Sequence, residues 1–232
     1  STARLIAGIP AVNKSLFHAV RFAVGDPAAC IDFLKDGQPA HRVFIVRDIE
    51  MGRARQHARA DAVSCPRDFE PAGGLSGDRE TATAQAVAEC LRRQQITLVV
   101  SDRTLPLIFA DHLRQAGIAL EYDAGMGVLS RRAKDTQEVE WLQSAQRATE
   151  DAMRMACETV ARASADANGV LHHHGERLSA EHLRFMIDVH LLKLGFSNPP
   201  SIVACGAQGA DCHEHGHGDL RTGQPVIVDI FP

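Results

Sequence analysis

Short apolar runs separated by longer amphipathic stretches fill the first half of the chain. Four of these runs predict strands, at residues 43–46, 97–100, 118–120 and 128–129. Between them, apolar residues recur every three or four positions, which is the spacing of one helix face. Strands that alternate with helices in this way favour an α/β layer with crossover connections.

Two helices of this first part have clear boundary signals. Residues 78–95 begin with Asp78, a good N-cap residue. Residues 104–116 carry Pro106 in the predicted first turn and are followed by Gly117, a stop signal.

The pattern changes near Arg131, where a second part of the chain begins. Asp135 is followed three residues later by Glu138, which resembles a capping box and predicts a long helix to about residue 164. Small and apolar residues recur along this helix at spacings of three and four. They are Val139, Leu142, Ala145, Thr149, Ala152, Ala156, Val160 and Ala163.

A second helix of this part begins after Ser179 and ends at Gly195. The segment before it, which contains three consecutive histidines at 172–174, predicts a loop. Two strands follow, separated by a loop rich in glycine and histidine. These last elements are a strand at 201–204, the loop at 206–218 and a strand at 226–231.

The last strand is too apolar to end a domain. Residues 225–231 predict a strand with partners on both sides. We therefore expect the chain to stop inside its second domain, so that residues 1–130 form one domain and residues 131–232 form the first part of another.

Composition narrows the class of protein. The 232 residues are 45% hydrophobic and 23% charged, which is ordinary for a soluble globular protein. A net charge of −4 does not predict a basic face for nucleic acid. No apolar run approaches the roughly 18 residues of a membrane helix, and the N-terminus does not resemble a signal peptide.

The six cysteines form no C-x-x-C pair and are irregularly spaced. We interpret them as reduced thiols of a cytoplasmic protein. Cys212 alone lies in the histidine-rich segment, and it is the one cysteine that we expect near a site.

Asp229 is the most informative single residue, because it lies inside an apolar strand. A buried carboxylate must be paired, hydrogen-bonded or bound to a cation. A metal ion bound to the carboxylate is one explanation for Asp229. The alternatives are an arginine partner and a strand with one solvated face.

Three histidines, His213, His215 and His217, alternate in the glycine-rich loop and would share one face of an extended segment. Neutral imidazoles on one face can bind a transition metal, although no H-E-x-x-H motif accompanies them. A substrate contact by one histidine and a polar surface loop are the alternatives.

Several motifs occur in an order that resembles one known family. Residues 131–145 read R-x-x-K-x-x-x-E-x-x-x-L-x-x-A, residues 202–206 read I-V-A-x-G, and residues 210–213 read A-D-x-H. Residues 220–229 then read L-x-x-G-x-P-V-I-V-D. Together they resemble the creatinase, prolidase and aminopeptidase P family, and residues 16–22 and 49–54 resemble its N-terminal domain.

This resemblance implies an α/β N-terminal domain followed by the first half of a pita-bread catalytic domain. It implies an Xaa-Pro peptidase that uses two divalent metal ions, Mn, Co or Zn, to cleave the amide bond before proline. In that scheme Asp229 is the first metal ligand, and His213 faces the scissile carbonyl of the substrate. His217 is a second candidate for substrate contact, and a homodimer is implied.

The sequence departs from the family pattern in its remaining ligands. A second aspartate, a histidine and two glutamates are expected after Pro232, so we expect this chain alone to bind no metal ion and to be inactive. Two alternatives stay open: a creatinase-like, metal-free amidinohydrolase that uses His213, and a non-catalytic module that self-associates. If Asp229 were turned into bulk water, far from His213 and with no cleft between them, the peptidase hypothesis should be abandoned.

Overall fold

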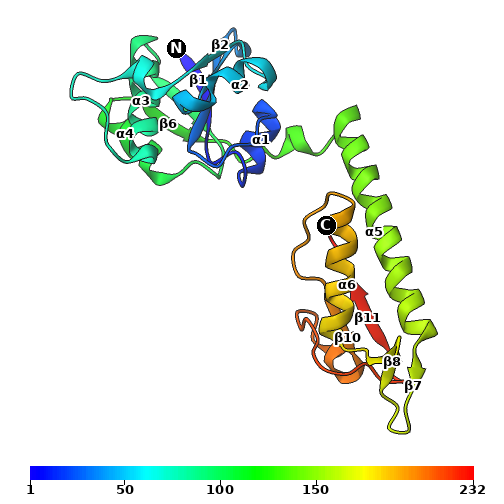
Figure 1. Cartoon of the computed structure of the whole chain (residues 1–232). Helices are drawn as coiled ribbons and strands as arrows, with labels where there is room; N and C mark the ends of the chain where they lie inside the picture. Colours follow the sequence, from blue (N-terminus) through cyan, green and yellow to red (C-terminus); the bar gives the residue numbers. More distant parts are fainter. The chain divides into compact units, whose positions relative to one another are not determined.

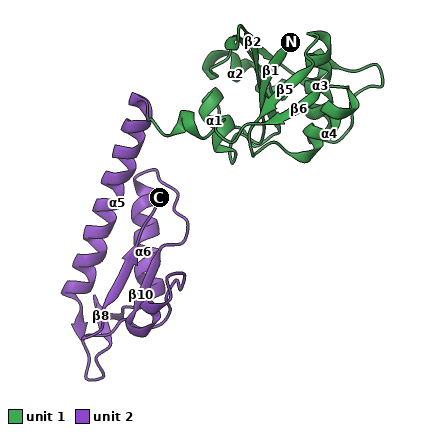
Figure 2. Ribbon diagram, turned by 180° about the vertical axis from the view of Figure 1, so that it is seen from behind, with its two compact units in different colours: residues 1–133 green, residues 134–232 purple.

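The computed structural model describes residues 1–232 and divides after Ala133. One unit is Ser1–Ala133 and the other is Lys134–Pro232 (Figure 2). The helices and strands of both units carry the labels of Figure 1.

A six-stranded mixed sheet organises the first unit, with strand order β4-β3-β2-β1-β5-β6. β1, β2 and β3 pair antiparallel in a meander, whereas β1 with β5, β5 with β6 and β3 with β4 are parallel. Three predicted strands, in β3, β5 and β6, are confirmed. The strands are β1 Thr2–Gly8, β2 Ala28–Lys35, β3 Gln38–Ile45, β4 Ala62–Ser64, β5 Leu98–Ser101 and β6 Ala119–Tyr122.

Helices cover both faces of this sheet, as Figure 1 shows. The core under α3 and α4 contains Leu5 and Ile31, and the core under α1 and α2 contains Leu16 and Phe44. The helices are α1 Lys14–Val20, α2 Met51–His57, α3 Arg79–Arg93 and α4 Leu107–Gln115, with the 3-10 turns η1 Asp48–Glu50, η2 Pro66–Phe69 and η3 Leu129–Arg131.

Helix boundaries follow local side-chain chemistry. The carboxylate of Asp78 accepts a hydrogen bond of 2.8 Å from the backbone nitrogen of Thr81, so the predicted cap of α3 is confirmed. α4 starts three residues later than predicted, because Pro106 has an extended backbone and is itself the N-cap. The strand predicted at 128–129 is wrong: the amides of both residues bond to the carbonyl oxygen of Gly125, which makes a turn.

The second unit places two helices against two small sheets. β10 and β11 form an antiparallel pair, and β7, β8 and β9 form a separate three-stranded sheet. The elements are α5 Thr136–Arg162, β7 Ser164–Ala165, β8 Leu171–His173, β9 Glu176–Arg177, α6 Ala180–Lys193, β10 Ile202–Cys205, η4 Gly206–Ala210 and β11 Val226–Asp229.

α5 begins at the predicted capping box, in which Asp135 and Glu138 exchange hydrogen bonds of 2.9 and 3.0 Å with each other's backbone nitrogens. Ala152 and Ala156 are fully buried against α6, as the spacing predicted. Val139 and Leu142 are exposed, however, because α5 continues well past the end of α6 (Figure 1). Only the second half of the predicted apolar face is therefore covered within this unit.

The three consecutive histidines do not lie in a simple loop. His172 and His173 belong to β8, and His174 starts the turn into β9 with a left-handed backbone, at φ 54°. The imidazole of His172 lies 3.4 Å from the carboxylate of Asp166. The short segments between α5 and α6 thus form a hairpin that the apolar pattern did not predict.

None of the helices is both long enough and apolar enough to cross a membrane.

Candidate functional site

Asp229 is the last residue of β11, and its side chain faces solvent. Its register partner across the pair is Ile202 in β10. No hydrogen bond or ion pair engages its carboxylate. Of the arrangements that the sequence left open, the structure shows the strand with one solvated face: the helices cover one face of the β10–β11 pair, and Asp229 lies on the other.

The open face is defined by Ile227 and Asp229 of β11. Val226 and Val228 alternate with them and pack against the core that contains α5 and α6 residues. Gly209 of η4 lies on the open face, since an ideal Cβ on it would be 2.7 Å from Cδ1 of Ile227. The segment that leads to His213 therefore starts on the face that carries Asp229.

The histidine loop, residues 211–218, follows η4 and packs along β10. The backbone nitrogen of Val203 donates a hydrogen bond of 3.0 Å to the carbonyl oxygen of His215. Backbone groups of successive strand residues point to opposite edges of the strand, and residues 202 and 204 alternate with Val203. This bond therefore uses the edge of β10 that β11 leaves free. The loop thereby occupies part of an otherwise unpaired strand edge.

Charged side chains of α6 hold the same loop. Arg184 donates through Nη1 to the carbonyl oxygens of His215 and Gly216, the latter at 2.8 Å. The backbone nitrogen of Gly218 donates to both carboxylate oxygens of Glu181, at 3.1 and 3.2 Å. Glu181 accepts a hydrogen bond from its own backbone amide as well, and these contacts hold its pKa below the ordinary value.

Gln208 fixes the far end of the loop. Its side-chain amide donates to the carbonyl oxygen of His217 at 2.9 Å and accepts from the backbone nitrogen of His217 at 3.1 Å. Glu214 lies 3.7 Å from the imidazole of His217 and also accepts a hydrogen bond from the backbone of Gly216. Main-chain contacts therefore order the loop, while its histidine side chains stay available.

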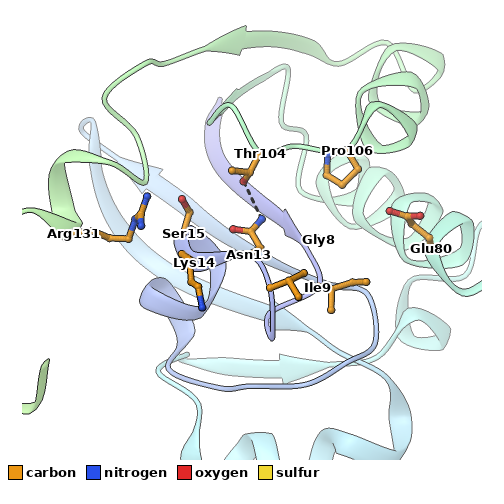
Figure 3. Close-up of a pocket in the computed structure, with 10 residues that line it drawn as sticks. Gly8, Ile9, Asn13, Lys14, Ser15, Glu80, Thr104, Pro106 and Arg131 are labelled. Atoms are coloured by element: carbon orange, nitrogen blue, oxygen red, sulfur yellow. Dashed lines mark hydrogen bonds between the residues drawn. The ribbon is translucent and has the colours of Figure 1, made fainter. Parts of the chain in front are cut away.

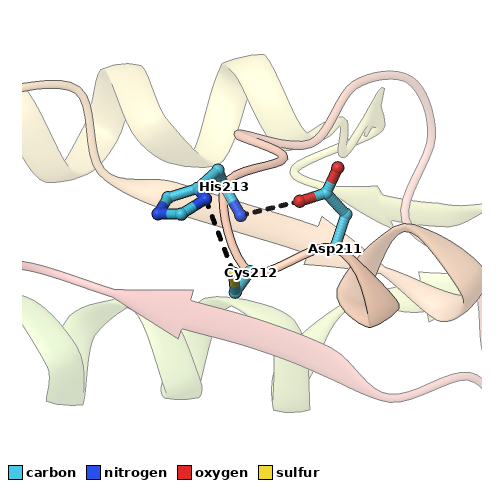
Figure 4. A group of neighbouring side chains, drawn as sticks. All are labelled: Asp211, Cys212 and His213. Atoms are coloured by element: carbon cyan, nitrogen blue, oxygen red, sulfur yellow. Dashed lines mark hydrogen bonds between the residues drawn. The ribbon is translucent and has the colours of Figure 1, made fainter.

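His213, His215 and His217 are all exposed, but they do not form the shared metal site considered from the sequence. The one group of potential metal ligands in the chain consists of Asp211, Cys212 and His213 (Figure 4). The turn at 211–213 breaks the extended geometry that would have put the three imidazoles on one face. Cys212, suspected from the sequence to be near a site, is part of this group.

The first unit has a pocket of its own, with a volume of about 520 Å³ (Figure 3). It lies between the loops that follow β1 and β5, at the carboxyl ends of parallel strands, where α/β proteins often bind ligands. Asn13 joins the two loops through a hydrogen bond of 2.9 Å to Thr104. No sequence motif indicated this pocket, because its lining comes from segments far apart in the chain.

Comparison with protein-family models finds no match, and a search of curated proteins finds none either. Solved structures match over nearly the whole chain. The Xaa-Pro dipeptidase from Bacillus anthracis matches with a TM-score of 0.74 at 16% identity, covering 99% of this chain and 56% of its own. This chain shares the fold of the corresponding part of that dipeptidase.

Two further solved structures share this fold. The prolidase from Pyrococcus furiosus has a TM-score of 0.70 at 12% identity, covering 98% of this chain and 60% of its own. The X-Pro aminopeptidase from Thermotoga maritima has a TM-score of 0.68 at 16% identity, covering 99% of this chain and 58% of its own. The chain thus spans less than two thirds of these Xaa-Pro peptidases, and it combines the predicted α/β N-terminal domain with the first part of a pita-bread domain.

Sequence reasoning singled out Asp229 and His213 as candidates but did not indicate the residues that hold the histidine loop. Glu181 and Arg184 lie three positions apart at the start of α6, on neighbouring helix positions. An acidic and a basic residue are common in the first turns of helices. Glu181 and Arg184 therefore indicate a loop contact only once the structure shows the histidine loop beside them.

Proposed function

We propose that this chain is part of a metal-dependent hydrolase of the Xaa-Pro peptidase type, which cleaves the amide bond before proline in peptides. The observation that carries the proposal is the open face, on which Asp229 and the start of the histidine loop lie within an Xaa-Pro peptidase fold. At this low identity, the similarity to the solved peptidases is evidence for the fold alone. The argument for the activity therefore rests on the arrangement of Asp229 and the histidine loop.

Asp229 fits the role of a metal ligand in its chemistry. Its carboxylate is exposed on the open face and has no competing cation, so its oxygens are available to a divalent ion. One carboxylate does not hold a pair of divalent ions, and the remaining ligands would come from outside residues 1–232. When bound, Mn, Co or Zn would supply an activated water and polarise the substrate carbonyl.

His213 would face the scissile carbonyl and donate a hydrogen bond to the oxygen on which negative charge develops. Its side chain is exposed, whereas the loop around it is fixed by Glu181, Arg184 and Gln208. His217 would contact the substrate further along, on backbone held by Gln208. A fixed main chain lowers the entropic cost of placing these imidazoles against a substrate.

The test uses a longer polypeptide that continues past residue 232, assayed on X-Pro dipeptides with and without Mn²⁺ or Co²⁺. We expect metal-dependent turnover that Asp229→Asn abolishes and that His213→Gln lowers by about 10²–10³ in kcat. His57→Gln, at the end of α2, is a matched control that leaves turnover unchanged. Absence of metal-dependent cleavage on any amide would refute the proposal.

The same assay separates the two alternatives. Turnover of a small guanidino compound that persists in excess chelator and needs His213 would favour a metal-free amidinohydrolase of the creatinase kind. A folded, longer polypeptide without any hydrolytic activity would favour a non-catalytic module.

Three further features belong to the proposal. The domain boundary is placed near residue 130, the assembly is a homodimer, and the protein is cytoplasmic. All six cysteines are free, which supports a reducing compartment. Sedimentation equilibrium tests the dimer, and limited proteolysis tests the boundary.

A further inference from the structure

Asp211, Cys212 and His213 bring three different metal-binding groups to one turn of the histidine loop. One ligand atom from each lies within 4.8 Å of the others. The thiol sulfur of Cys212 and Nδ1 of His213 are 3.5 Å apart, and Figure 4 shows both at the same turn as the Asp211 carboxylate.

The sulfur–nitrogen distance equals the spacing that a tetrahedral metal requires. Bond lengths of about 2.3 Å to sulfur and about 2.05 Å to nitrogen, at a tetrahedral angle, separate the two ligand atoms by about 3.6 Å. The observed 3.5 Å is therefore compatible with both atoms binding one ion. A carboxylate oxygen of Asp211 lies within 4.8 Å of the other two ligand atoms and is the third candidate ligand.

The turn itself is ordered before any ion binds. The backbone nitrogen of His213 donates a hydrogen bond of 2.9 Å to Asp211, and the backbone nitrogen of Glu214 bonds to the carbonyl oxygen of Asp211 at 3.2 Å. The hydrogen bonds to Val203, Arg184 and Glu181 fix the rest of the loop.

Cys212 is also one of only two thiols that solvent can reach. Cys157 on α5 is the other, and the remaining four cysteines are buried. Burial raises the pKa of the Cys30 and Cys90 thiols to about 12, which keeps them protonated and unsuited to metal binding.

We propose that Cys212, His213 and Asp211 form a binding site for one borderline transition-metal ion of the Zn²⁺ or Co²⁺ class. The thiolate, the imidazole and the carboxylate supply three ligands, and solvent occupies the fourth position. Binding breaks the S–H bond of Cys212, forms the metal–sulfur bond and releases the proton to solvent. A thiolate ligand selects these ions over Mn²⁺ and Mg²⁺, which prefer oxygen.

This site uses other ligands than the cation site proposed at Asp229, and its three protein ligands all lie within residues 1–232. It has a consequence for the proposed peptidase, since an ion on the imidazole of His213 removes that group from the substrate. The two proposals are tested by different measurements, one by metal binding and the other by peptide cleavage.

The experiment is a Co²⁺ titration of the tag-free chain of residues 1–232, kept reduced with a phosphine and followed by absorption spectroscopy. We expect one Co²⁺ per chain, a thiolate-to-cobalt charge-transfer band in the near ultraviolet, visible bands of tetrahedral cobalt, and displacement by Zn²⁺. Cys212→Ser is expected to remove the charge-transfer band and to weaken binding at least about tenfold.

Cys157→Ser is the matched control, because it removes the only other exposed thiol and is expected to leave the spectrum and the affinity unchanged. Asp211→Asn weakens binding severalfold while keeping the charge-transfer band, which tests the carboxylate without removing the sulfur. Circular dichroism of each variant establishes that it is folded.

Three outcomes would overturn the proposal. They are a charge-transfer band that survives in Cys212→Ser, a folded parent chain that binds no stoichiometric Co²⁺ or Zn²⁺, and Mn²⁺ affinity equal to that for Zn²⁺. The second outcome would mean that the contact between Cys212 and His213 is a hydrogen bond only.

Discussion

Gly216 in the histidine loop packs directly on Val203 in β10: an ideal Cβ at position 216 would lie 1.7 Å from the Val203 carbonyl oxygen. The backbone of Gly216 is also left-handed, at φ +81°. This close approach lets the loop lie against β10 and keeps His215 within hydrogen-bonding distance of the Val203 amide. A side chain at position 216 would push the loop off the strand.

Gly216→Ala is therefore expected to release the histidine loop, with Gly218→Ala as the control. Gly218 has a similar φ of +75° but nothing within 4 Å of its ideal Cβ, so it carries the cost of the backbone conformation without the clash. We expect a loss of about 1 kcal/mol for Gly218→Ala and about 2 kcal/mol more for Gly216→Ala. Urea unfolding measures the difference in stability between the two variants, and faster hydrogen exchange at the Val203 amide would locate it in the histidine loop. Equal losses of stability in the two variants would contradict the role of the close contact.

Glu181 makes the anchoring of the loop sensitive to acid. Its pKa is held below the ordinary value of 4.5 by its own backbone amide and by that of Gly218. A pKa lowered by folding stabilises the folded state above pH 4.5, and this contribution is lost as the pH falls through the lowered pKa.

The chemical shift of the Gly218 amide proton, followed by NMR, is expected to titrate with a midpoint below pH 4.5. Glu181→Gln should remove that transition and leave the shifts in the first unit unchanged. A midpoint at or above the ordinary value would show that the Gly218 contact does not stabilise the carboxylate.

Asp229→Asn is expected to leave the stability of the chain almost unchanged, within about 0.5 kcal/mol, because the carboxylate is exposed and has no partner. The contrasting variant is Asp166→Asn, since Asp166 accepts hydrogen bonds from the backbone nitrogens of Asn168 and Val170 at 2.8 and 3.0 Å. Thermal unfolding compares the two. A marked loss of stability in Asp229→Asn would mean that Asp229 has a structural rather than a functional role.

Arg42 and Asp32 form a bidentate ion pair in the first unit. The guanidinium donates through Nε and Nη2 to the two carboxylate oxygens, at 2.6 and 2.8 Å, and through Nη1 to the carbonyl oxygen of Ala19 at 2.7 Å. Only 14% of the Asp32 side chain is exposed, so losing Arg42 leaves a largely buried carboxylate unpaired.

Arg42→Ala is therefore expected to destabilise the first unit by about 2 kcal/mol, and Arg42→Lys by about 1 kcal/mol because lysine cannot form the two parallel bonds. Arg154→Ala is the control: its ion pair with Asp151 is exposed, with 68% and 51% of the two side chains accessible, and its loss should cost less than about 0.5 kcal/mol. Hydrogen exchange in β2 and β3, measured with urea unfolding, assigns the effect to the first unit. A full rescue by lysine would contradict the argument from bidentate geometry.

Local chemistry explains what the sequence by itself determined. The N-caps at Asp78, Asp135 and Ser179 were predictable, because each side chain bonds to a backbone nitrogen three residues away. The α/β alternation and the resemblance to the prolidases were also visible, since both depend on residues in a fixed order. The strands β1 and β2 were missed because their register and burial depend on neighbours that no short window contains.

Only the tertiary structure decided which candidate residues face solvent and which are held in place. The apolar sequence of its strand left open whether Asp229 is buried or faces solvent. Asp229 is exposed, because burial depends on what covers each face of a strand and helices cover only one face here. Packing between segments also explains three other features that the sequence did not predict. They are the exposed start of α5, the fixation of the histidine loop by Glu181 and Arg184, and the approach of Cys212 to His213. Periodicity specifies which side chains share a face, whereas packing between distant segments specifies what that face meets.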